Sequence, residues 1–561
     1  MYICDLVKIF LISYRIILIN KTNSTNSTLH FHFTSIHTML FLNEFQDYLI
    51  HALHVDMDWK PGPVAIFFAW TVFTLYIISL IFTTVYCLMQ FQLFRYYHRY
   101  RRLHPQDPPP PRPMTDAELP MVTIQLPMFN EKYVVEKLVD VMMKMDYPKD
   151  KFEVHVIDDS NDETVEIAQK KVAEWKAKGY QIEYIRRQHR QGYKAGALKD
   201  AMPLAKGDFL AIFDADFEPY PDFLRKTIPY FQDPKVGVVQ TRWEHINEEY
   251  SLITKLQVLP LNVHFTVEQL GRMAGGLLLQ FNGTAGVWRK QTIEDAGGWE
   301  SDTLTEDLDL SIRAQLEGYK IMFLEKLGSP AELPAEMNSF KAQQHRWMKG
   351  GAETARKMLP TIWKSDRLGL WQKIQATFHL MGSTLFLMVF MMGIMSVPVM
   401  HTMSYIGIPK GVFTWFMVGF LSMVVIYYTG NVTADISNRT KKSIFLSFLW
   451  RFPMCLSLSL GLALHNARAV IEGWRGKRTE FVRTPKFNIA NKGDAMKKGN
   501  YIAAKLKWET IFEGVLMLYF IFGVLDGLLF ANTEFLTFHL MLAVGYGSIF
   551  FYTLSHLYRQ Q

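Results

Sequence analysis

Two long uncharged runs constrain the fold of this chain more than any other feature. Residues 61–94 and 374–408 carry no side chain with a formal charge. Each run exceeds the roughly 20 apolar residues that span the hydrocarbon core of a bilayer. The chain is therefore predicted to be an integral, multi-pass membrane protein, with the lipid bilayer as a partner. The predicted spans are residues 64–89, 374–400, 411–430, 509–530 and 535–556.

Basic residues after the first run orient the chain. The sequence "FRYYHRYRR" occupies residues 94–102, and positive charge next to a span favours the cytoplasmic side. Residues 443–470 have only a short apolar run, which follows Arg451 and Pro453. If the soluble domain before this segment and the basic loop after it are both cytoplasmic, the segment makes no single crossing. We expect a re-entrant or interfacial helix pair there.

Changes in composition divide the chain into six parts. The net charge of +7 is modest for 561 residues and its bases are dispersed, so no nucleic-acid partner is expected. The predicted parts are an N-terminal extension whose true start is open (1–60), a first membrane helix (61–94), a basic and proline-rich linker (95–115), a water-soluble domain (116–340), an interfacial region (341–370) and a C-terminal membrane region (371–561).

The soluble domain alternates β-rich and helical segments. Amphipathic stretches at 131–145 and 163–178 separate short apolar runs. This alternation predicts a parallel sheet with both faces covered, and ligands of such sheets bind beyond the carboxyl ends of the strands. The predicted strands are residues 121–126, 152–157, 180–185 and 209–213.

Acidic pairs follow two of these strands. Asp158 and Asp159 follow the second strand, where they suit either a base and ribose or, through Asp159 or Ser160, a helix cap. Asp214 and Asp216 follow the fourth strand with only an alanine between them. Two carboxylates at this spacing suit a hard divalent cation, and a solvated turn is the alternative.

Two helical segments follow in the sequence. "TLTEDLDLS" opens one helix with a threonine cap and three acids, which either complement the helix dipole or include a general base. "FKAQQHRWMKGGAET" places Gln343, Arg346 and Trp347 on one helical face. That face suits lipid headgroups, a protein partner or a flat anionic ligand, and an interfacial helix with a Trp anchor is the alternative.

The order of the short motifs carries a resemblance. "PMFNE", "DDS", "QGYKAGAL", "DAD", "FNGT", "TED" and "QQHRW" occur in this order inside one α/β domain flanked by membrane spans. The series resembles the processive family 2 glycosyltransferases, and more closely the cellulose synthase-like A and C proteins that make mannan and glucan backbones. "EFVRTPKF" at residues 480–487 resembles their gating loop, here 476–500. Three cysteines exclude the RING-like cluster of plant cellulose synthases.

The resemblance covers residues 60–557 and implies a fold and an activity. The fold is a GT-A, Rossmann-like cytosolic catalytic domain inserted between transmembrane helices. The activity is inverting transfer of hexosyl units from GDP-mannose or UDP-glucose to a growing β-1,4-linked polysaccharide, which is also translocated, with Mg²⁺ or Mn²⁺ as cofactor. Transfer of one sugar to a membrane lipid and an inactive channel or scaffold are the alternatives.

The resemblance also implies a location and further partners. The membrane is the plasma membrane in a bacterium and the Golgi membrane in a eukaryote. An accessory export protein or a second copy of the chain is kept open as a partner.

Site residues are implied in the same way. The catalytic pair is Asp307, as the base, and Glu306. The residues at the nucleotide sugar are Asp158, Asp159, Lys194, Asp214, Gln343 and Arg346. Asp214 and Asp216 hold the metal. The acceptor residues are Trp347, Phe281, Gly283 and Thr284, and the gating-loop residues are Phe481, Val482, Arg483 and Thr484.

Overall fold

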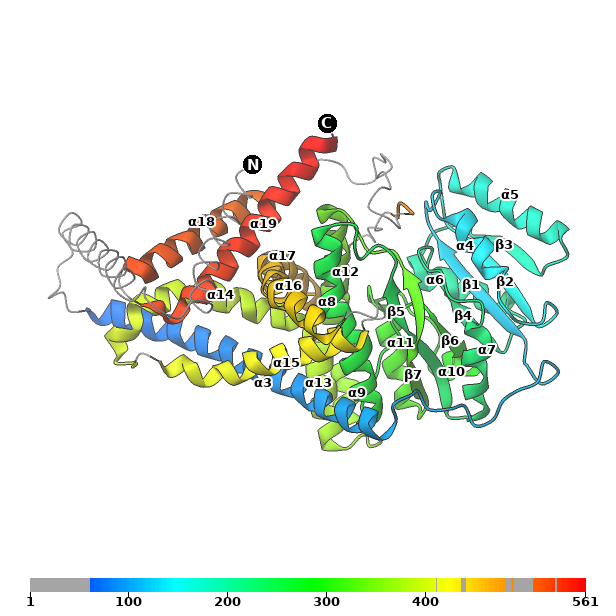
Figure 1. Cartoon of the computed structure of the whole chain (residues 1–561), viewed down its shortest axis with the longest axis horizontal. Helices are drawn as coiled ribbons and strands as arrows, with labels where there is room; N and C mark the ends of the chain where they lie inside the picture. The colour runs from blue at the N-terminus through cyan, green and yellow to red at the C-terminus, as the bar shows by residue number, and fades with distance from the viewer. Residues whose placement is uncertain are drawn as a thin grey trace, which may run out of the picture.

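The computed structural model describes a long molecule with two unlike ends. A bundle of long helices forms one end and a sheet domain the other, with helix α12 (Met337–Lys364) standing between them (Figure 1). The predicted gating residues Phe481, Val482, Arg483 and Thr484 and the extension 1–60 lie outside the described residues. The structure describes residues 61–409, 411–434, 440–479, 486–488, 508–529 and 532–560.

Within the described residues, seven strands form the sheet at the end opposite the helical bundle, in the order β3-β2-β1-β4-β6-β5-β7. All four predicted strands are present as β1 to β4, and β1 pairs in parallel with β2 and β4. The strands are β1 (Val122–Met128), β2 (Phe152–Asp158), β3 (Ile182–Arg186), β4 (Phe209–Ile212), β5 (Val236–His245), β6 (Gly286–Arg289) and β7 (Lys320–Ala331).

The predicted parallel pairing holds for β1 to β4, but β6, which was not predicted, departs from a parallel sheet. This strand runs antiparallel to both β4 and β5. Its first residue, Gly286, pairs with Ile212 at the carboxyl end of β4, so the chain enters β6 at that edge and runs back along β4. The sheet is therefore mixed, and the turn that precedes β6 lies where ligands are expected.

Alternation of side chains explains the apolar runs of the strands. In β4, Phe209 and Ala211 join the hydrophobic core on one face of the sheet, and Leu210 and Ile212 join the core on the other. Burial on both faces therefore requires an unbroken apolar strand. The covering helices are α4 (Val135–Met142), α5 (Thr164–Ala177), α6 (Tyr193–Ala201), α7 (Phe223–Thr227), α10 (Lys290–Asp295) and α11 (Glu306–Leu316).

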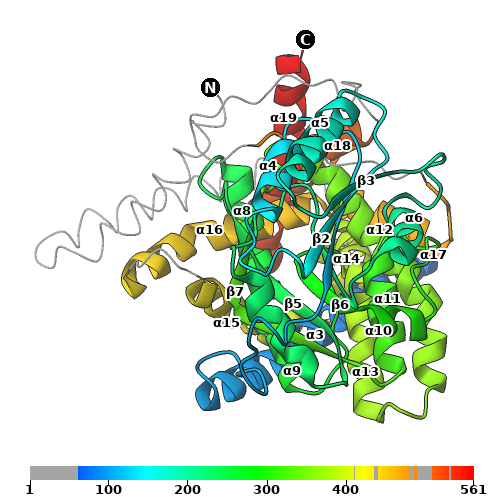
Figure 2. The same cartoon turned by 90° about the vertical axis from the view of Figure 1, so that its right-hand side faces the viewer.

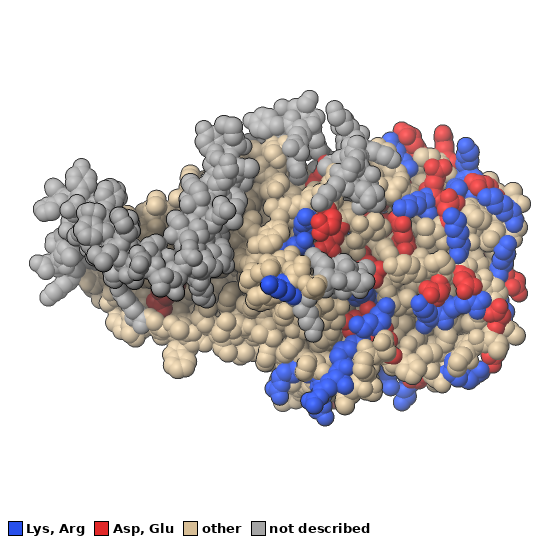
Figure 3. All heavy atoms as spheres, in the orientation of Figure 1, with Lys and Arg blue, Asp and Glu red and all other residues tan. Residues whose placement is uncertain are grey.

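The other end of the molecule matches the predicted multi-pass membrane region. Within the described residues, six segments are long and apolar enough to cross a membrane. Figure 3 shows charged side chains gathered over the sheet domain and few over the helical end. The helices of these segments are α3 (Pro63–Leu103), α13 (Leu370–Leu380) with α14 (Thr384–Thr402), α15 (Met417–Ala434), α16 (Lys441–Gly461), α18 (Trp508–Leu529) and α19 (Leu536–Gln560).

Three boundaries differ from the prediction. Segment 443–470 forms a helix pair, α16 and α17 (Ala463–Trp474), but α16 is long enough to cross, so the structure does not support excluding a crossing. Helix α3 continues beyond residue 94 to Leu103, where Arg101 pairs with Glu325 of β7 at 2.5 Å. The predicted boundary at 340 falls inside α12. Figure 2 looks along the long axis of the molecule, with the sheet domain in front of the helical bundle.

Candidate active site

A cavity of about 190 Å³ lies at the carboxyl edge of the sheet, bounded by α11 and α12. Segments that are far apart in sequence meet there, as parallel-sheet topology predicts. Ten of the predicted site residues line it: Asp159, Lys194, Asp214, Asp216, Gly283, Glu306, Asp307, Gln343, Arg346 and Trp347.

The "DAD" turn is held in place by the segments beside it. The backbone N–H of Asp214 donates to Oγ1 of Thr284 at 2.8 Å. The Lys194 ammonium forms an ion pair with the Asp214 carboxylate and also donates to the carbonyl of Gly283 at 2.8 Å. Asp214, the first acid of the turn, is thus fixed against the "FNGT" segment, and its carboxylate is paired with the Lys194 ammonium.

The second acid of the turn is also paired with a lysine. Asp216, whose side chain is 8% exposed, forms an ion pair with Lys486. The backbone amides of Phe487 and Asn488 donate to the carboxylate of Glu332 at 3.1 and 2.9 Å. Residues 486–488 are therefore anchored at the cavity. Lys486 lies within the "EFVRTPKF" motif, but its residue type and position alone did not distinguish it from the other bases there.

Asp307 and Glu306 form the first turn of α11 and face the cavity. Gly283 has φ of +80°, and a Cβ atom built on it would lie 2.9 Å from Oδ2 of Asp307 and 3.6 Å from Nζ of Lys194. Burial and the neighbouring charge of Glu306 raise the pKa of Asp307 to about 7. Burial likewise raises the pKa of Glu306. A carboxyl with such a pKa is suited to accept a proton near neutral pH.

The "FNGT" segment contributes less to the wall than expected. Ser311 of α11 donates to the carbonyl of Asp307 at 2.6 Å and accepts from the backbone N–H of Phe281 at 2.8 Å. Phe281 is fully buried and Thr284 is 1% exposed, and neither side chain lines the cavity. Phe281 and Thr284 therefore do not border the acceptor end as expected but position the turn. Of the three predicted residues of this segment, only Gly283 borders the cavity.

The "DDS" acids have different surroundings. Asp158 is fully buried and accepts hydrogen bonds from the Tyr184 hydroxyl and the Ser160 amide, both at 2.8 Å, so its expected place at the nucleotide is corrected. Asp159 lines the cavity and pairs with Arg187. The helix-cap alternative is wrong as well, because the carboxylate that accepts from the first turn of α5 is that of Asp162.

Helix α12 presents Gln343, Arg346 and Trp347 to the cavity, as the spacing predicts. Burial lowers the pKa of Arg346, and the nearby carboxylates of Asp214 and Glu306 partly offset that effect. Burial also acts to lower the pKa of Lys194, but the charges of Asp214 and Glu306 outweigh it and raise this pKa. Both cations therefore stay charged beside the acids.

Strained backbone surrounds the cavity. In the described part of the chain, four non-glycine residues have positive φ, which is uncommon outside special sites. They border the cavity segments: Asn130, Tyr193, Ala285 and Asn488. No sequence pattern predicts them. The same holds for Arg190, whose guanidinium lies 3.4 Å from the Phe129 ring centroid in the same wall.

Comparison with known proteins identifies the family. The family Glycosyl transferase family 2 matches residues 123–291, and Glycosyl transferase family group 2 matches residues 209–429. The chain is 35% identical over 418 residues to glucomannan 4-beta-mannosyltransferase 1 of Oryza sativa subsp. japonica, covering 72% of this chain and 76% of that protein. The chain belongs to the family 2 glycosyltransferases. It is a hexosyltransferase, and the expected GT-A catalytic domain among membrane helices is confirmed.

Two further proteins are similar to this glycosyltransferase. It is 34% identical over 442 residues to probable glucomannan 4-beta-mannosyltransferase 10 of Arabidopsis thaliana, with 76% of each chain covered. Among solved structures, the mannosyltransferase PcManGT from Pyrobaculum calidifontis, in complex with GDP-Man and Mn²⁺, gives a TM-score of 0.45 at 18% identity and covers 72% of this chain and 100% of that chain.

Proposed function

We propose that this glycosyltransferase transfers mannosyl units from GDP-mannose, and glucosyl units from UDP-glucose as a second donor, to the 4-hydroxyl of a growing β-linked polysaccharide. One observation carries the proposal: Asp216, Asp307 and Trp347, from three separate segments, line one cavity. The relatives are glucomannan 4-beta-mannosyltransferases, which supports the mannosyl donor and the linkage.

In this proposal Asp307 is the general base. Its pKa of about 7 lets it take a proton from the acceptor hydroxyl at neutral pH. The hydroxyl then attacks the anomeric carbon from the side opposite the leaving diphosphate, so the configuration inverts. Lys194 and Arg346 lie in the same wall, where they stabilise the negative charge of that leaving group.

Asp214 and Asp216 are the residues that would hold a divalent metal. They offer the hard oxygen ligands that Mg²⁺ and Mn²⁺ prefer. Each of these carboxylates faces an ammonium group, that of Lys194 or Lys486, so a bound metal would take the place of a positive charge that already lies beside the acids. A bound metal would supply charge stabilisation on the donor diphosphate.

In this proposal the acceptor end of the cavity lies on the side of the membrane helices. Trp347 offers a flat surface on which a sugar ring can stack, and α12 packs against α17 on the side of the helical bundle. We place the growing chain along Trp347 and its exit between the membrane helices, with the catalytic domain in the cytosol. Since the named relatives are plant proteins, the membrane of this proposal is that of the Golgi.

The proposal is tested on purified protein in nanodiscs with a panel of radiolabelled sugar nucleotides. Label from GDP-mannose should enter a polymer that endo-β-mannanase degrades, and an Asp307→Asn variant should give none. A solvent-extractable labelled lipid would instead indicate transfer of one sugar to a lipid acceptor. Absence of incorporation from every donor would overturn the enzymatic proposal and favour the scaffold.

Translocation is tested separately. In proteoliposomes whose catalytic domains face outward, the polymer should accumulate inside and resist added endo-β-mannanase until detergent is present. Full sensitivity before detergent would contradict export by this chain.

A further inference from the structure

Helix α12 touches the segment that carries the proposed base along one continuous face. Arg346 and Trp347 lie in the cavity wall, and Gly350, about one helical turn further on, packs against Thr305. A Cβ atom on Gly350 would lie 2.6 Å from Cγ2 and 3.0 Å from the backbone nitrogen of Thr305. Only a glycine at position 350 permits α12 to come this close to Thr305. Thr305 immediately precedes Glu306 in the chain.

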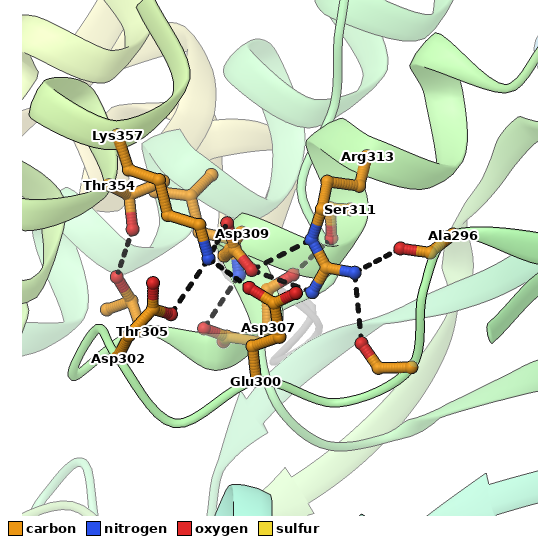
Figure 4. Close-up of polar contacts among 12 residues, drawn as sticks. Ala296, Glu300, Asp302, Thr305, Asp307, Asp309, Ser311, Arg313, Thr354 and Lys357 are labelled. Carbon is orange, nitrogen blue, oxygen red and sulfur yellow. Dashed lines mark hydrogen bonds and ion pairs between the residues drawn. The ribbon is translucent and has the colours of Figure 1, made fainter. Parts of the chain in front are cut away.

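Hydrogen bonds extend the contact along the same face. The backbone N–H of Leu304 donates to the carboxylate of Glu353 at 2.9 Å. Thr305 occupies the N-cap position of α11, yet its side chain makes no capping bond there. Its hydroxyl instead lies 3.0 Å from that of Thr354 on α12, as Figure 4 shows. The expected threonine cap is thus replaced by a bond between the two helices.

The far end of the contact is an ion cluster. Glu300, Asp302 and Asp309 have carboxylate atoms within 4.8 Å of one another, a spacing that suits a cation. The cation among them is Lys357 of α12, which pairs with Glu300 and lies 2.8 Å from Asp302 and 3.1 Å from Asp309 (Figure 4). The ammonium of Lys357 therefore takes the place among the three carboxylates that a bound cation would occupy.

Asp309 links this cluster to the rest of α11. It is fully buried, and its second carboxylate oxygen accepts from Arg313 at 2.7 and 3.0 Å. Arg313 in turn donates to the carbonyls of Ala296 and Gly298 in the loop before α11. Because Arg313 still balances Asp309 when Lys357 is replaced, loss of Lys357 leaves no unpaired buried charge.

We propose that Lys357, together with Gly350, Glu353 and Thr354, is a positioning device that fixes the distance between the carboxylate of Asp307 and the ligands held by Arg346 and Trp347. This inference rests on the proposed function, since it assigns the base and the ligand face to a transfer reaction. Misplacement by about 1 Å can lower a rate about 100-fold. The cluster lies outside the cavity wall, so it acts on the rate through geometry and not through contact with the substrate.

The test compares Lys357→Met with Lys357→Arg and with Lys364→Met, an exposed lysine near the end of the same helix. Lys357→Met should lower kcat of transfer about ten- to 100-fold with the donor KM within about twofold. Lys357→Arg should restore most of the rate, and Lys364→Met should behave as the wild type. An unchanged kcat, or a Lys357→Met loss that Lys357→Arg does not rescue, overturns the positioning role.

Hydrogen exchange separates this inference from the proposed function. Amides of residues 303–309 should exchange about tenfold faster in Lys357→Met than in the wild type or Lys364→Met, whatever the substrate is. Unchanged exchange overturns the contact as a restraint on α11. If the wild type transfers no sugar but exchange changes as expected, the restraint stands and the proposed function fails.

Discussion

The ammonium of Lys486 is paired with the carboxylate of Asp216, although the two residues are 270 positions apart. The carboxylate belongs to the turn after β4, and the lysine belongs to the segment before the last two membrane helices. Lys486 is therefore already paired with one of the two carboxylates that are proposed to hold a metal. A metal and this lysine compete for the same charge.

Replacing Lys486 should strengthen metal binding in the absence of donor. Lys486→Met removes the competing ammonium, so the affinity for Mn²⁺ should rise about tenfold, equivalent to about 1.4 kcal/mol. Titration followed by electron paramagnetic resonance measures free Mn²⁺ directly. Lys132→Met, which removes a lysine from a pair with the exposed Glu163, is the control and should leave the affinity unchanged. Equal or weaker binding by Lys486→Met would contradict the competition.

Chelation should stop transfer. Asp214 and Asp216 offer the carboxylates, and a diphosphate leaves poorly without added positive charge. Treatment with EDTA should reduce incorporation to background, and excess Mn²⁺ or Mg²⁺ should restore it. Asp216→Asn should not be rescued by either ion. Full activity in EDTA would refute the metal assignment.

The proposed base predicts a pH profile. Asp307 must be deprotonated to act, and its pKa is about 7, so kcat/KM should fall about tenfold per unit below that pH. Removing the negative charge of Glu306 in Glu306→Gln stabilises the Asp307 carboxylate and lowers its pKa, so the rising limb should move to lower pH. Glu317→Gln, at the exposed end of the same helix, should leave the limb in place. If the rising limb does not move in Glu306→Gln, the pH profile is not set by the Asp307–Glu306 pair.

The sequence was sufficient for residues whose role depends on strand ends and helix spacing. Asp214, Asp216, Gln343 and Arg346 all line the cavity, because a strand's end and a helical face are local properties. The neighbours Asp158 and Asp159 could not be told apart in advance. Successive side chains of an extended strand point to opposite faces, and only Asp159 reaches the wall.

Features that depend on contacts between distant parts of the chain could not be predicted from the sequence. Lys486 reaches Asp216 only because the chain returns from the membrane region to the catalytic end. Strand β6 has four residues, too few to show a period, and its antiparallel direction depends on its pairing with β4. The threonine at 305 has the right type for a cap, but close packing at Gly350 brings it a different partner.

Gly283→Ala should damage catalysis more than folding. The residue has φ of +80°, and an added Cβ would meet Asp307 Oδ2 at 2.9 Å, so both the turn and the base must shift. Transfer should fall at least tenfold, while the melting temperature should fall only a few degrees because the strain, about 1–3 kcal/mol, is local. Gly276→Ala, which also has positive φ but open space around it, is the matched control and should retain activity. Similar activity losses in both variants would assign the effect to backbone strain alone.

Trp347→Ala should shorten the product without weakening the donor. The indole lines the cavity, and stacking with a sugar ring is worth about 1 kcal/mol. The KM for a β-linked oligosaccharide acceptor should therefore rise about fivefold, and the size distribution of the polymer should move to shorter chains. Trp347→Phe keeps an aromatic surface, so its acceptor KM and its polymer length should lie between those of the wild type and Trp347→Ala. The KM for GDP-mannose should be the same in the wild type and both variants. A rise in the donor KM with an unchanged product length would place the indole at the nucleotide and not at the acceptor.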